Sequence, residues 1–360
     1  MKKITLSAVG FMLVLSAMAQ NPVWHNPIIE VAPGTTNVHN QAWNEDGGNY
    51  RRLPQRAEQT VRPKLWDLST NSAGLQIQFT TDSRNISVRY GVTGPMAMPH
   101  MPATGVSGVD LYRNNDGAFC YGTYSFGDST VQYNYTINRP AERANKQYTL
   151  YLPLFNEVKN LEIGVDTDAS FSFVPKSNEK PIVVYGTSIT HGACASRPAM
   201  AWTNILQRTI NAPIVNLGFS GNGKLEPELL DLINEIDSRV IILDCMANLF
   251  QVPQNELTQL VEDAVMKIRS KSDVPILLVE HAGYSNMFSN QEKHDAFTNA
   301  NTSQRAAYKK LQKNGVKNLH YLTTEQIAMP ADAWVDYVHP TDLGQQHHAK
   351  AVAKALKKCL

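Results

Sequence analysis

Clustered charge is the first thing that this sequence lacks. Its 360 residues include 33 Lys and Arg against 32 Asp and Glu, the formal net charge is +1, and charged residues make up 18% of the chain. No block of like charges occurs in it. Proteins that bind nucleic acid usually present a clustered basic face, because the phosphates must be neutralised. The sequence therefore predicts no nucleic-acid partner.

Cysteine is scarce as well. Cys120, Cys194, Cys245 and Cys359 lie far apart, without the C-x-x-C spacing that is typical of zinc sites and redox pairs. We therefore predict no metal site. Cys194 and Cys245 lie near segments that carry candidate site residues, but we interpret both as small buried side chains. Disulfide pairing stays open, because a protein of this size does not depend on it.

Long apolar runs are absent except near the N-terminus. Lys2 and Lys3 precede an apolar run at residues 4–15, and the small–x–small sequence Ala-Met-Ala follows at 17–19. This order is typical of a secretory signal peptide, so we predict that residues 1–19 are removed and that the protein is exported, to the periplasm or beyond. The run is shorter than the roughly 20 residues of a membrane-spanning helix, so no membrane span is expected.

The rest of the chain exceeds what one hydrophobic core usually organises, so we expect two domains. Within residues 20–177, apolar and polar residues alternate, most clearly at 75–90, and turn-forming residues separate the alternating stretches. A period of two is typical of half-buried strands. We predict an all-β sandwich of jelly-roll-like type. Further strands are expected at residues 108–112, 121–124, 148–152 and 161–165.

Residues 178–360 follow a different pattern, in which short apolar runs alternate with amphipathic stretches. Unbroken apolar runs are typical of parallel strands that are covered on both faces. Strands are predicted at residues 182–185, 214–217, 240–243, 276–279 and 319–322, and most of them are unbroken apolar runs. Helices are predicted at residues 225–236, 257–268 and 343–358. We therefore predict a three-layer α/β domain with a parallel sheet, whose ligands bind at the carboxyl ends of the strands.

Polar or flexible residues follow several of these strands. Ser188 follows the first strand, Gly221 lies in a glycine-rich turn after the second, and Asn248 follows the third. Asp336 and His339 stand three residues apart just before the last helix. Because the carboxyl ends of parallel strands meet at one edge of the sheet, we expect these residues to converge.

Such a set contains the parts that acyl transfer requires. A serine nucleophile needs a base, the base needs an orienting acid, and the tetrahedral intermediate needs hydrogen-bond donors. We assign Ser188 as the nucleophile, His339 as the base and Asp336 as the acid. The Ser188 N–H, the Gly221 N–H and the Asn248 amide would form the oxyanion hole. Taken alone, Ser188 would more often be a helix N-cap and His339 a surface histidine.

The order and content of these motifs resemble the four blocks of the SGNH, or GDSL-type, hydrolases. The resemblance covers residues 181–360 and implies an esterase or acylhydrolase on a three-layer α/β/α fold, with no metal and no organic cofactor. Thr187 and Ile189 replace the Asp and Leu of Gly-Asp-Ser-Leu, and Met-Ala-Asn replaces Gly-x-Asn in the third block. These departures concern substrate preference more than chemistry. An α/β-hydrolase would instead carry G-x-S-x-G and an acid far upstream of the histidine.

The first half carries a motif of its own, GVDLY at residues 108–112. It resembles the GxDLY β-domain that precedes an SGNH domain in a group of exported bacterial proteins. Two-domain carbohydrate esterases, which remove acetyl groups from polysaccharides, are similar in layout. Asp110 and Tyr112 are interpreted as structural residues, a turn carboxylate and a core aromatic.

Three other features have two interpretations each. The loop at 94–105 carries His100 among three methionines and would line a substrate cleft or fill the domain interface, and we favour the interface. Glu280 and His281 end the fourth strand and are interpreted as a structural pair. His347 and His348 begin the last helix without metal-ligand partners, so we interpret them as solvated surface.

Together these patterns predict an exported serine esterase that removes short acyl groups, acetyl in particular, from small-molecule or oligosaccharide esters. Two alternatives stay open. One is a lipase or lysophospholipase, and the other is a glycan-binding protein with a vestigial hydrolase site.

Overall fold

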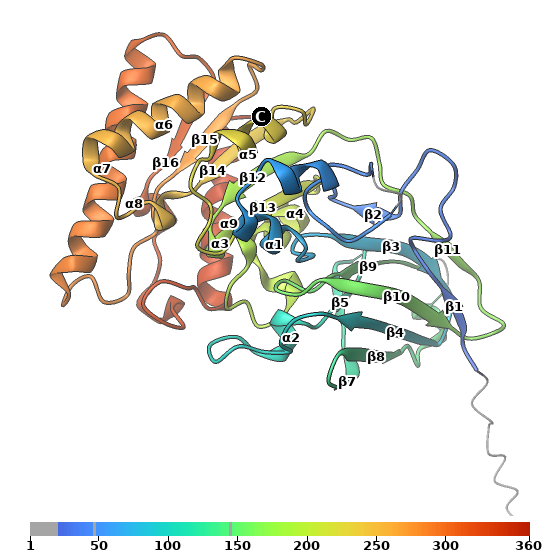
Figure 1. Ribbon diagram of the computed structural model, residues 1–360. Helices are drawn as coiled ribbons and strands as arrows, with labels where there is room; N and C mark the ends of the chain where they lie inside the picture. The colour runs from blue at the N-terminus through green and yellow to red at the C-terminus, as the bar shows by residue number, and fades with distance from the viewer. Residues whose placement is uncertain (1–20, 46–47, 115, 144–145) are drawn as a thin grey trace, which may run out of the picture.

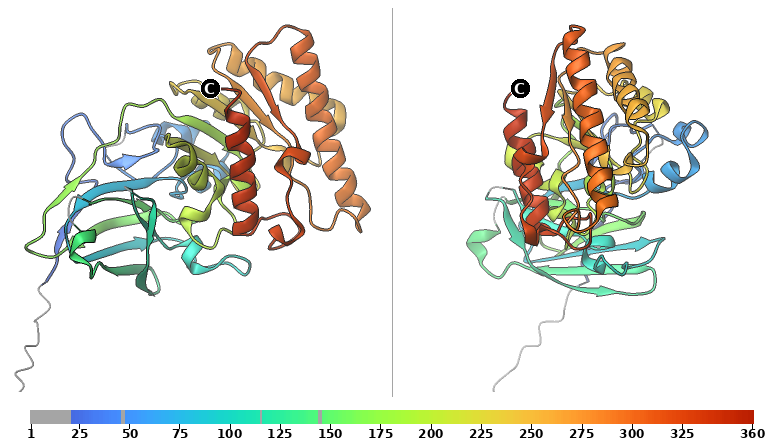
Figure 2. Two further views of the ribbon diagram at one scale, coloured as in Figure 1. Left: turned by 180° about the vertical axis from the view of Figure 1, so that it is seen from behind. Right: turned by 90° about the vertical axis from the view of Figure 1, so that its left-hand side faces the viewer.

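Two antiparallel sheets and one parallel sheet organise the chain in the computed structural model, which describes residues 21–45, 48–114, 116–143 and 146–360 (Figure 1). The signal peptide predicted at residues 1–19 lies outside the described residues. The antiparallel sheets stand beside the parallel α/β part, and the chain passes from one to the other near residue 177 (Figures 1 and 2).

The antiparallel sheets pack face to face, which confirms the predicted β-sandwich. One sheet has the order β1 (Val23–His25), β10 (Val158–Val165), β4 (Asn85–Val92), β8 (Thr130–Thr136) and β7 (Gly122–Phe126). The other has the order β11 (Phe171–Phe173), β3 (Gln76–Thr81), β9 (Lys146–Tyr151), β5 (Asp110–Arg113) and β6 (Ala118–Cys120), and β2 (Val38–His39) pairs with β3. Alternate side chains of both sheets share one core, among them Phe79 and Leu111 from one and Val88 and Ile163 from the other.

All strands of the third sheet are parallel, which confirms the predicted α/β part. Its order is β13 (Ile214–Gly218), β12 (Ile182–Gly186), β14 (Val240–Asp244), β15 (Ile276–Val279) and β16 (Leu319–Leu322). The chain leaves β12 toward β13 on one side and returns to β14 on the other. In a doubly wound sheet this reversal opens a crevice at the carboxyl ends of the two central strands. Ligands are therefore expected beyond the ends of β12 and β14.

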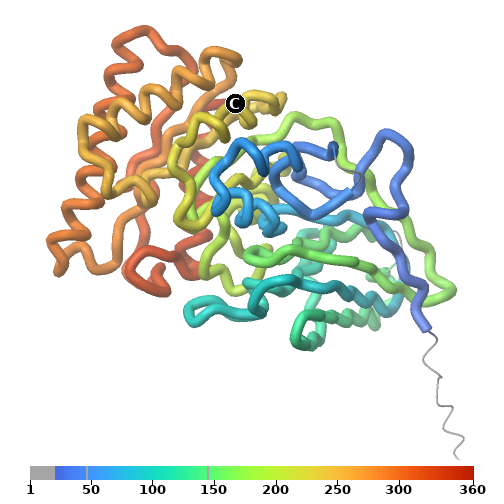
Figure 3. Tube along the Cα trace, viewed as in Figure 1, coloured from blue at the N-terminus to red at the C-terminus, as the bar shows by residue number. Residues whose placement is uncertain are grey.

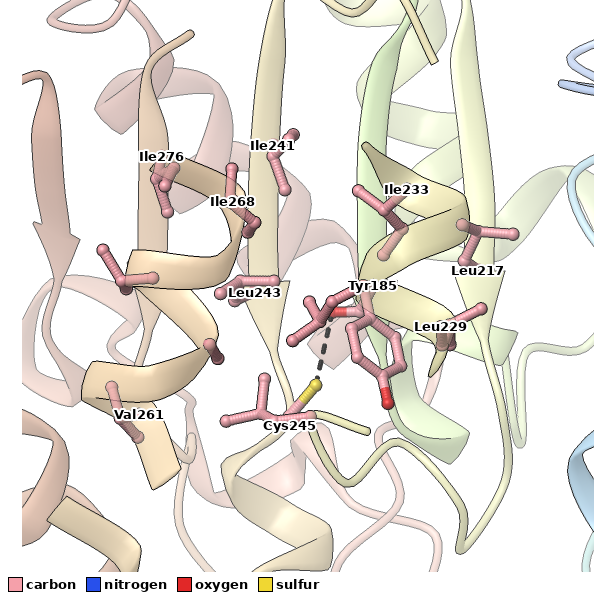
Figure 4. Packing of buried hydrophobic residues seen from close by; sticks show 14 of the residues in the cluster. Tyr185, Leu217, Leu229, Ile233, Ile241, Leu243, Cys245, Val261, Ile268 and Ile276 are labelled. Atoms are coloured by element: carbon pink, nitrogen blue, oxygen red, sulfur yellow. Dashed lines mark hydrogen bonds between the residues drawn. The ribbon is translucent and has the colours of Figure 1, made fainter. Parts of the chain in front are cut away.

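Helices cover both faces of the parallel sheet (Figure 2). One face carries α5 (Pro227–Ile233), α6 (Gln254–Arg269) and α7 (Gln291–Lys313), and the other carries α4 (Trp202–Ile210) and α9 (Asp342–Leu356). Successive strand residues point to opposite faces. Tyr185 and Leu243 therefore pack against α5 and α6, as Figure 4 shows, whereas Val184 and Ile242 face Trp202 of α4.

The N-terminal segment lies against the parallel-sheet part. It contains η1 (Gln55–Gln59) and α1 (Pro63–Ser69), drawn in blue in Figure 3. Leu53 and Leu65 are buried in the same core as α5 and α6. The core of the parallel-sheet part thus includes residues that precede the domain boundary predicted after residue 177.

Short helical turns complete the structure: α2 (Ala103–Val106), η2 (Pro140–Glu142), α3 (Ser188–His191), η3 (Pro198–Met200), η4 (Met246–Asn248), α8 (Thr324–Ile327) and η5 (Ala331–Ala333). None of the helices in the described part of the chain combines the length and the apolar character that a membrane span requires.

Candidate active site

Ser188 lies at the point where β12 turns into α3. Thr187 is the N-cap of this short helix, and its Oγ1 accepts the N–H of Ile189 at 3.2 Å. The N-cap role that the sequence left open for Ser188 is thus filled by its neighbour. Gly186 leaves no room for a side chain, because a Cβ there would lie 2.1 Å from Thr190 Oγ1 and 2.9 Å from the Asp244 carbonyl. These local constraints leave the Ser188 hydroxyl free for another partner.

That partner is His339. Its Nε2 lies 2.9 Å from Ser188 Oγ, and its Nδ1 lies 2.8 Å from Asp336 Oδ2. An ionised carboxylate can only accept hydrogen bonds, so Nδ1 donates to Asp336 and Nε2 accepts from the serine hydroxyl. The structure therefore brings the three predicted residues into one hydrogen-bonded chain, although Ser188 and His339 are 151 positions apart.

Asp336 is held in its ionised form by local hydrogen bonds. Its Oδ1 accepts the N–H of Val338 at 2.8 Å and the N–H of His339 at 2.7 Å. Burial on its own raises the pKa of the Asp336 carboxyl, but the hydrogen bonds from His339 and Val338 outweigh it and hold the pKa below its ordinary value. A carboxylate with this pKa stays charged beside the imidazole over the neutral pH range.

The turn that carries the acid and the base closes on itself. Val335 N–H donates to the His339 carbonyl at 2.9 Å, and Thr341 N–H donates to the Ala333 carbonyl at 2.8 Å. The turn is also fixed from outside, because the Ser285 N–H donates to the carbonyl of Tyr337 at 3.0 Å. Asp336 and His339 are therefore positioned by backbone contacts within and around this turn.

Gly221 and Asn248 lie at the same edge, after β13 and β14. Gly221 is exposed with φ of +69°, a conformation that favours glycine, and a Cβ there would meet nothing within 4 Å. Asn248 is oriented by its hydrogen bonds: Oδ1 accepts the N–H of Asn222 and the N–H of Gly223, each at 3.0 Å. This orientation turns Nδ2 away from the glycine loop, where it can donate to a ligand.

The N-terminal segment supports the glycine loop through Arg62. The Arg62 guanidinium donates to Asn222 Oδ1 at 2.8 Å and to the Asn222 carbonyl at 3.3 Å, and it forms an ion pair with Glu226. Sequence reasoning missed Arg62, because a contact across 160 positions leaves no local pattern.

A second arginine, the buried Arg52, supports the start of the same loop. Arg52 Nη1 donates to the Gly218 carbonyl at 2.6 Å, and its guanidinium lies 4.7 Å from the ring centre of Phe219. Burial lowers the pKa of Arg52 to about 9. The first seventy residues thus contribute directly to the loop that carries Gly221.

The loop at 94–105 reaches the site from the β-sandwich. Met98 and Met101 pair through two backbone hydrogen bonds of 3.0 Å, and Met101 is buried against Leu154 and Cys194, between the two halves of the chain. This part of the loop fills the interface, as we interpreted. His100 is exposed, however, and its ring centre lies 5.7 Å from that of His339. The loop therefore also borders the candidate active site.

Cys194 contacts the backbone of this loop. Its thiol donates to the His100 carbonyl at 3.5 Å. Burial, with a smaller contribution from the charge of Asp336, raises the pKa of the Cys194 thiol to about 12. All four cysteines are free, and Cys194 and Cys245 are both buried, as the sequence indicated.

Glu280 and His281 form buried structural contacts, as we interpreted. Glu280 is fully buried, accepts the Tyr321 hydroxyl at 2.7 Å and pairs with Arg305. His281 Nδ1 accepts the N–H of Gly283 at 2.8 Å, and burial lowers the pKa of this imidazole to about 3.

The interpretation of His348 as solvated surface is wrong. Its side chain is buried between the sheet and α4, with its ring centre 4.7 Å from that of Trp202 and its Nε2 3.5 Å from Asp244 Oδ2. His348 lies on the inner face of α9, and that face packs against the sheet.

Asp110 of the GVDLY motif has a structural role that links the two halves. Its carboxylate is buried and accepts the guanidinium of Arg197 at 3.0 Å and the N–H of Ala199 at 2.7 Å. Burial raises the pKa of Asp110, and the charge of Arg197 opposes this rise only in part. Strand β5 is thereby tied to η3 of the α/β part.

Comparison with known proteins agrees with this geometry. Residues 179–357 match the model of the GDSL-like Lipase/Acylhydrolase family, and residues 24–171 match a model described as the N-terminus of Esterase_SGNH_hydro-type. No curated protein matches the sequence.

Three solved structures illustrate the likeness. A Bacteroides ovatus protein described as a GDSL-like lipase is 32% identical, with a TM-score of 0.84 over 94% of this chain and 98% of its own. A salicylyl-acyltransferase from a tetracycline biosynthetic pathway is 20% identical, with a TM-score of 0.75 over 95% and 98%. An active-site mutant of a family two carbohydrate esterase from Clostridium thermocellum is 12% identical, with a TM-score of 0.51 over 79% and 90%. The last two show the shared fold alone.

The identity and the coverage of the Bacteroides ovatus protein establish the family, and the two matched segments account for both halves of the chain. The protein therefore belongs to the GDSL-like lipase/acylhydrolase family, as an SGNH-type esterase with a GxDLY N-terminal region.

Proposed function

We propose that this protein is an exported serine esterase that removes short acyl groups, acetyl first among them, from carbohydrate esters. The observation that carries the proposal is the chain of hydrogen bonds from Ser188 through His339 to Asp336, at 2.9 and 2.8 Å. These distances are those of a nucleophile, a general base and an orienting acid that are ready to react.

In the proposed reaction, Ser188 Oγ attacks the ester carbonyl while His339 Nε2 takes its proton. The imidazolium, stabilised by Asp336, then protonates the leaving alcohol, and an acyl-enzyme remains. Water, activated by the same imidazole, attacks the acyl-enzyme and releases the acid, which restores the serine. The Ser188 N–H, the Gly221 N–H and Asn248 Nδ2 would donate to the oxyanion in both steps.

Two features support a carbohydrate ester as the substrate. The N-terminal sequence predicts export, which brings the protein to extracellular and periplasmic glycans. Gly221 and His100 are both exposed, and a Cβ at Gly221 would meet nothing within 4 Å, so we expect the site to admit a bulky alcohol from solvent. A family two carbohydrate esterase from Clostridium thermocellum shares the fold at 12% identity, and this likeness also supports the proposal.

The first prediction concerns the nucleophile itself. Ser188→Ala should reduce the hydrolysis of p-nitrophenyl acetate by a factor on the order of 10⁴ to 10⁶, because no other group can form the acyl-enzyme. Ser289→Ala, which changes an exposed serine, is the matched control and should retain the rate of the unchanged protein.

Acetate release from acetylated oligosaccharides then tests the substrate class. Equal rates for the unchanged protein and Ser188→Ala would favour the glycan-binding alternative, and activity confined to long-chain esters would favour a lipase or lysophospholipase.

A further inference from the structure

Four side chains that can bind metal meet at the edge of the proposed active site. They are His100, Cys194, Asp336 and His339, and each offers one ligand atom such that all four atoms lie within 4.8 Å of one another. Four ligands around one zinc ion, with bonds of about 2.0 to 2.3 Å, stand about 3.3 to 3.8 Å apart. The largest of these separations is therefore only about 1 to 1.5 Å more than one zinc ion requires.

We infer that these four residues form a binding site for Zn²⁺, and that the bound ion inhibits the enzyme. The inhibitory part of this inference rests on the proposed esterase function, whereas the binding part does not. The ligand set determines the choice of metal. One thiolate, two imidazoles and one carboxylate suit zinc, while Mg²⁺ and Ca²⁺ require a shell of oxygen ligands.

The fold holds the ligands close together without a metal. Cys194 follows α3 with φ of +63°, and its thiol contacts the backbone of His100 at 3.5 Å. The pairing of Met98 with Met101 fixes the loop on which His100 stands. Because the His100 side chain is exposed while the Cys194 side chain is buried, an ion can approach from solvent on the histidine side.

Ion binding at this place is incompatible with general-base catalysis. Both ring nitrogens of His339 are already engaged, one with Ser188 and the other with Asp336. A metal bound to either nitrogen replaces one of these two hydrogen bonds. It therefore removes either the acceptor of the serine proton or the contact that orients the ring.

Zinc binding needs no oxidant or reductant, because it changes only the protonation of the ligands. Cys194 binds as a thiolate and releases its proton to solvent, the two imidazoles bind through neutral nitrogens, and Asp336 is already ionised. Removal of the ion by a chelator returns a proton to the thiol and restores the starting state. Zinc is thus a reversible inhibitor in this scheme.

Sequence spacing could not reveal such a site. The ligands come from the β-sandwich, from the segment after the first parallel strand and from the turn before the last helix. Only Asp336 and His339 are close in sequence, at a spacing that the acid–base pair already explains.

The test begins with metal binding alone, on the chelator-treated full-length protein. Zn²⁺ competition against a chromophoric chelator should show one tight site per chain, and His100→Ala and Cys194→Ser should each weaken it by about tenfold or more. His294→Ala and Cys120→Ala change a histidine and a cysteine outside the cluster and should bind Zn²⁺ like the unchanged protein. Bound Co²⁺ should give thiolate charge-transfer absorption that Cys194→Ser lacks. Thermal unfolding in chelator confirms that each variant is folded.

Activity is measured second, on p-nitrophenyl acetate. Zn²⁺ should inhibit hydrolysis, EDTA should restore it, and Mg²⁺ at the same concentration should have no effect. In His100→Ala the inhibition curve should move to higher Zn²⁺ by the same factor as the binding curve.

The outcomes separate the two proposals. Ser188→Ala should be inactive yet bind Zn²⁺ fully, because Ser188 is not a ligand. Binding and inhibition that are unchanged in both His100→Ala and Cys194→Ser would overturn the inference. A metal-free protein without esterase activity that still binds Zn²⁺ through His100 and Cys194 would overturn the proposed function and leave the metal site standing.

Discussion

At the residue scale, the two polar atoms of the Asn248 amide have different partners. Its Oδ1 accepts two backbone N–H groups of the glycine loop at 3.0 Å, and its Nδ2 is one of the donors that we propose for the substrate oxyanion. We expect Asn248→Ala to reduce kcat by about 10² to 10³, because one preorganised donor is lost. The measurement is kcat on p-nitrophenyl acetate beside the melting temperature.

Asn248→Asp separates the two tasks of this amide. The aspartate still accepts the two backbone N–H groups of the glycine loop. Its second carboxylate oxygen, however, faces the negative charge that develops on the substrate oxyanion. Its kcat should therefore fall at least as far as that of Asn248→Ala. Recovery of the rate in Asn248→Asp would mean that the residue acts by supporting the loop and not by donating to the oxyanion.

His281 gives the stability a defined pH dependence. Burial lowers its pKa from 6.5 to about 3, so between these values the unfolded chain binds a proton that the folded chain excludes. The contribution of the neutral His281 to the stability of the folded protein is complete above pH 6.5 and is lost as the pH falls toward 3. Because of this group, we expect the free energy of unfolding to decrease by about 2 kcal/mol when the pH falls from 7 to 5.

Urea unfolding at the two pH values measures this effect. His281→Asn keeps an acceptor for the Gly283 N–H but has no titrating ring, so its free energy of unfolding should fall less than that of the unchanged protein. Parallel losses in both proteins would show that other groups account for the pH dependence.

At the scale of elements, the glycine loop at residues 218–223 is supported by the start of helix α1, which lies far before it in the sequence. Arg62, at the start of α1, donates to Asn222 at 2.8 Å and pairs with Glu226. Arg62→Met should lower kcat by about threefold to thirtyfold with a smaller change in KM, because the oxyanion donors lose their exact placement while the triad remains intact. Arg56→Met is the matched control, since Arg56 forms exposed ion pairs with Glu45 and Glu235 instead. Equal effects of both substitutions on kcat would contradict the proposed support of the loop.

The parallel strands could be predicted to within a residue, because strands that are buried on both faces appear as unbroken apolar runs. The prediction was poorest where this signal is weak. Helix α7 was missed, because its 23 residues are mostly polar and only a few small apolar side chains, such as Ala300 and Ala307, face the sheet. Strand β8 was also missed, although Val131, Tyr133 and Tyr135 alternate inward along it.

The candidate site was predictable in part for a similar reason. Ser188, Gly221 and Asn248 each follow a strand whose end the sequence marks, and Asp336 and His339 share one short motif. Arg62 and His100 have no such marker. Their roles arise only from tertiary contacts, and no periodicity along the chain records these contacts.

At the scale of the whole molecule, the two halves share contacts that neither can satisfy alone. Arg52 donates to the Gly218 carbonyl at 2.6 Å, His191 contacts the Leu154 carbonyl at 2.7 Å, and Asp110 pairs with Arg197. The core around α5 and α6 also contains Leu53 and Leu65.

We therefore expect residues 21–360 to unfold in a single transition, with far-ultraviolet circular dichroism and tryptophan fluorescence coinciding. Residues 178–360 alone should be poorly soluble or should lack a cooperative transition, because their core loses several fully buried side chains. A cooperative unfolding curve from the shorter chain, or two separated transitions in the longer one, would show that the halves are independent.

The closed turn from Ala333 to Thr341 has a consequence for how the enzyme can be switched on and off. Asp336 and His339 are joined to each other by hydrogen bonds within this turn, so a displacement of the whole turn would move them together. Such a movement would change the gap between the imidazole and the serine hydroxyl, which is 2.9 Å in this structure. Any ligand or substitution that shifts the turn should therefore change the rate through proton transfer, independently of the oxyanion donors.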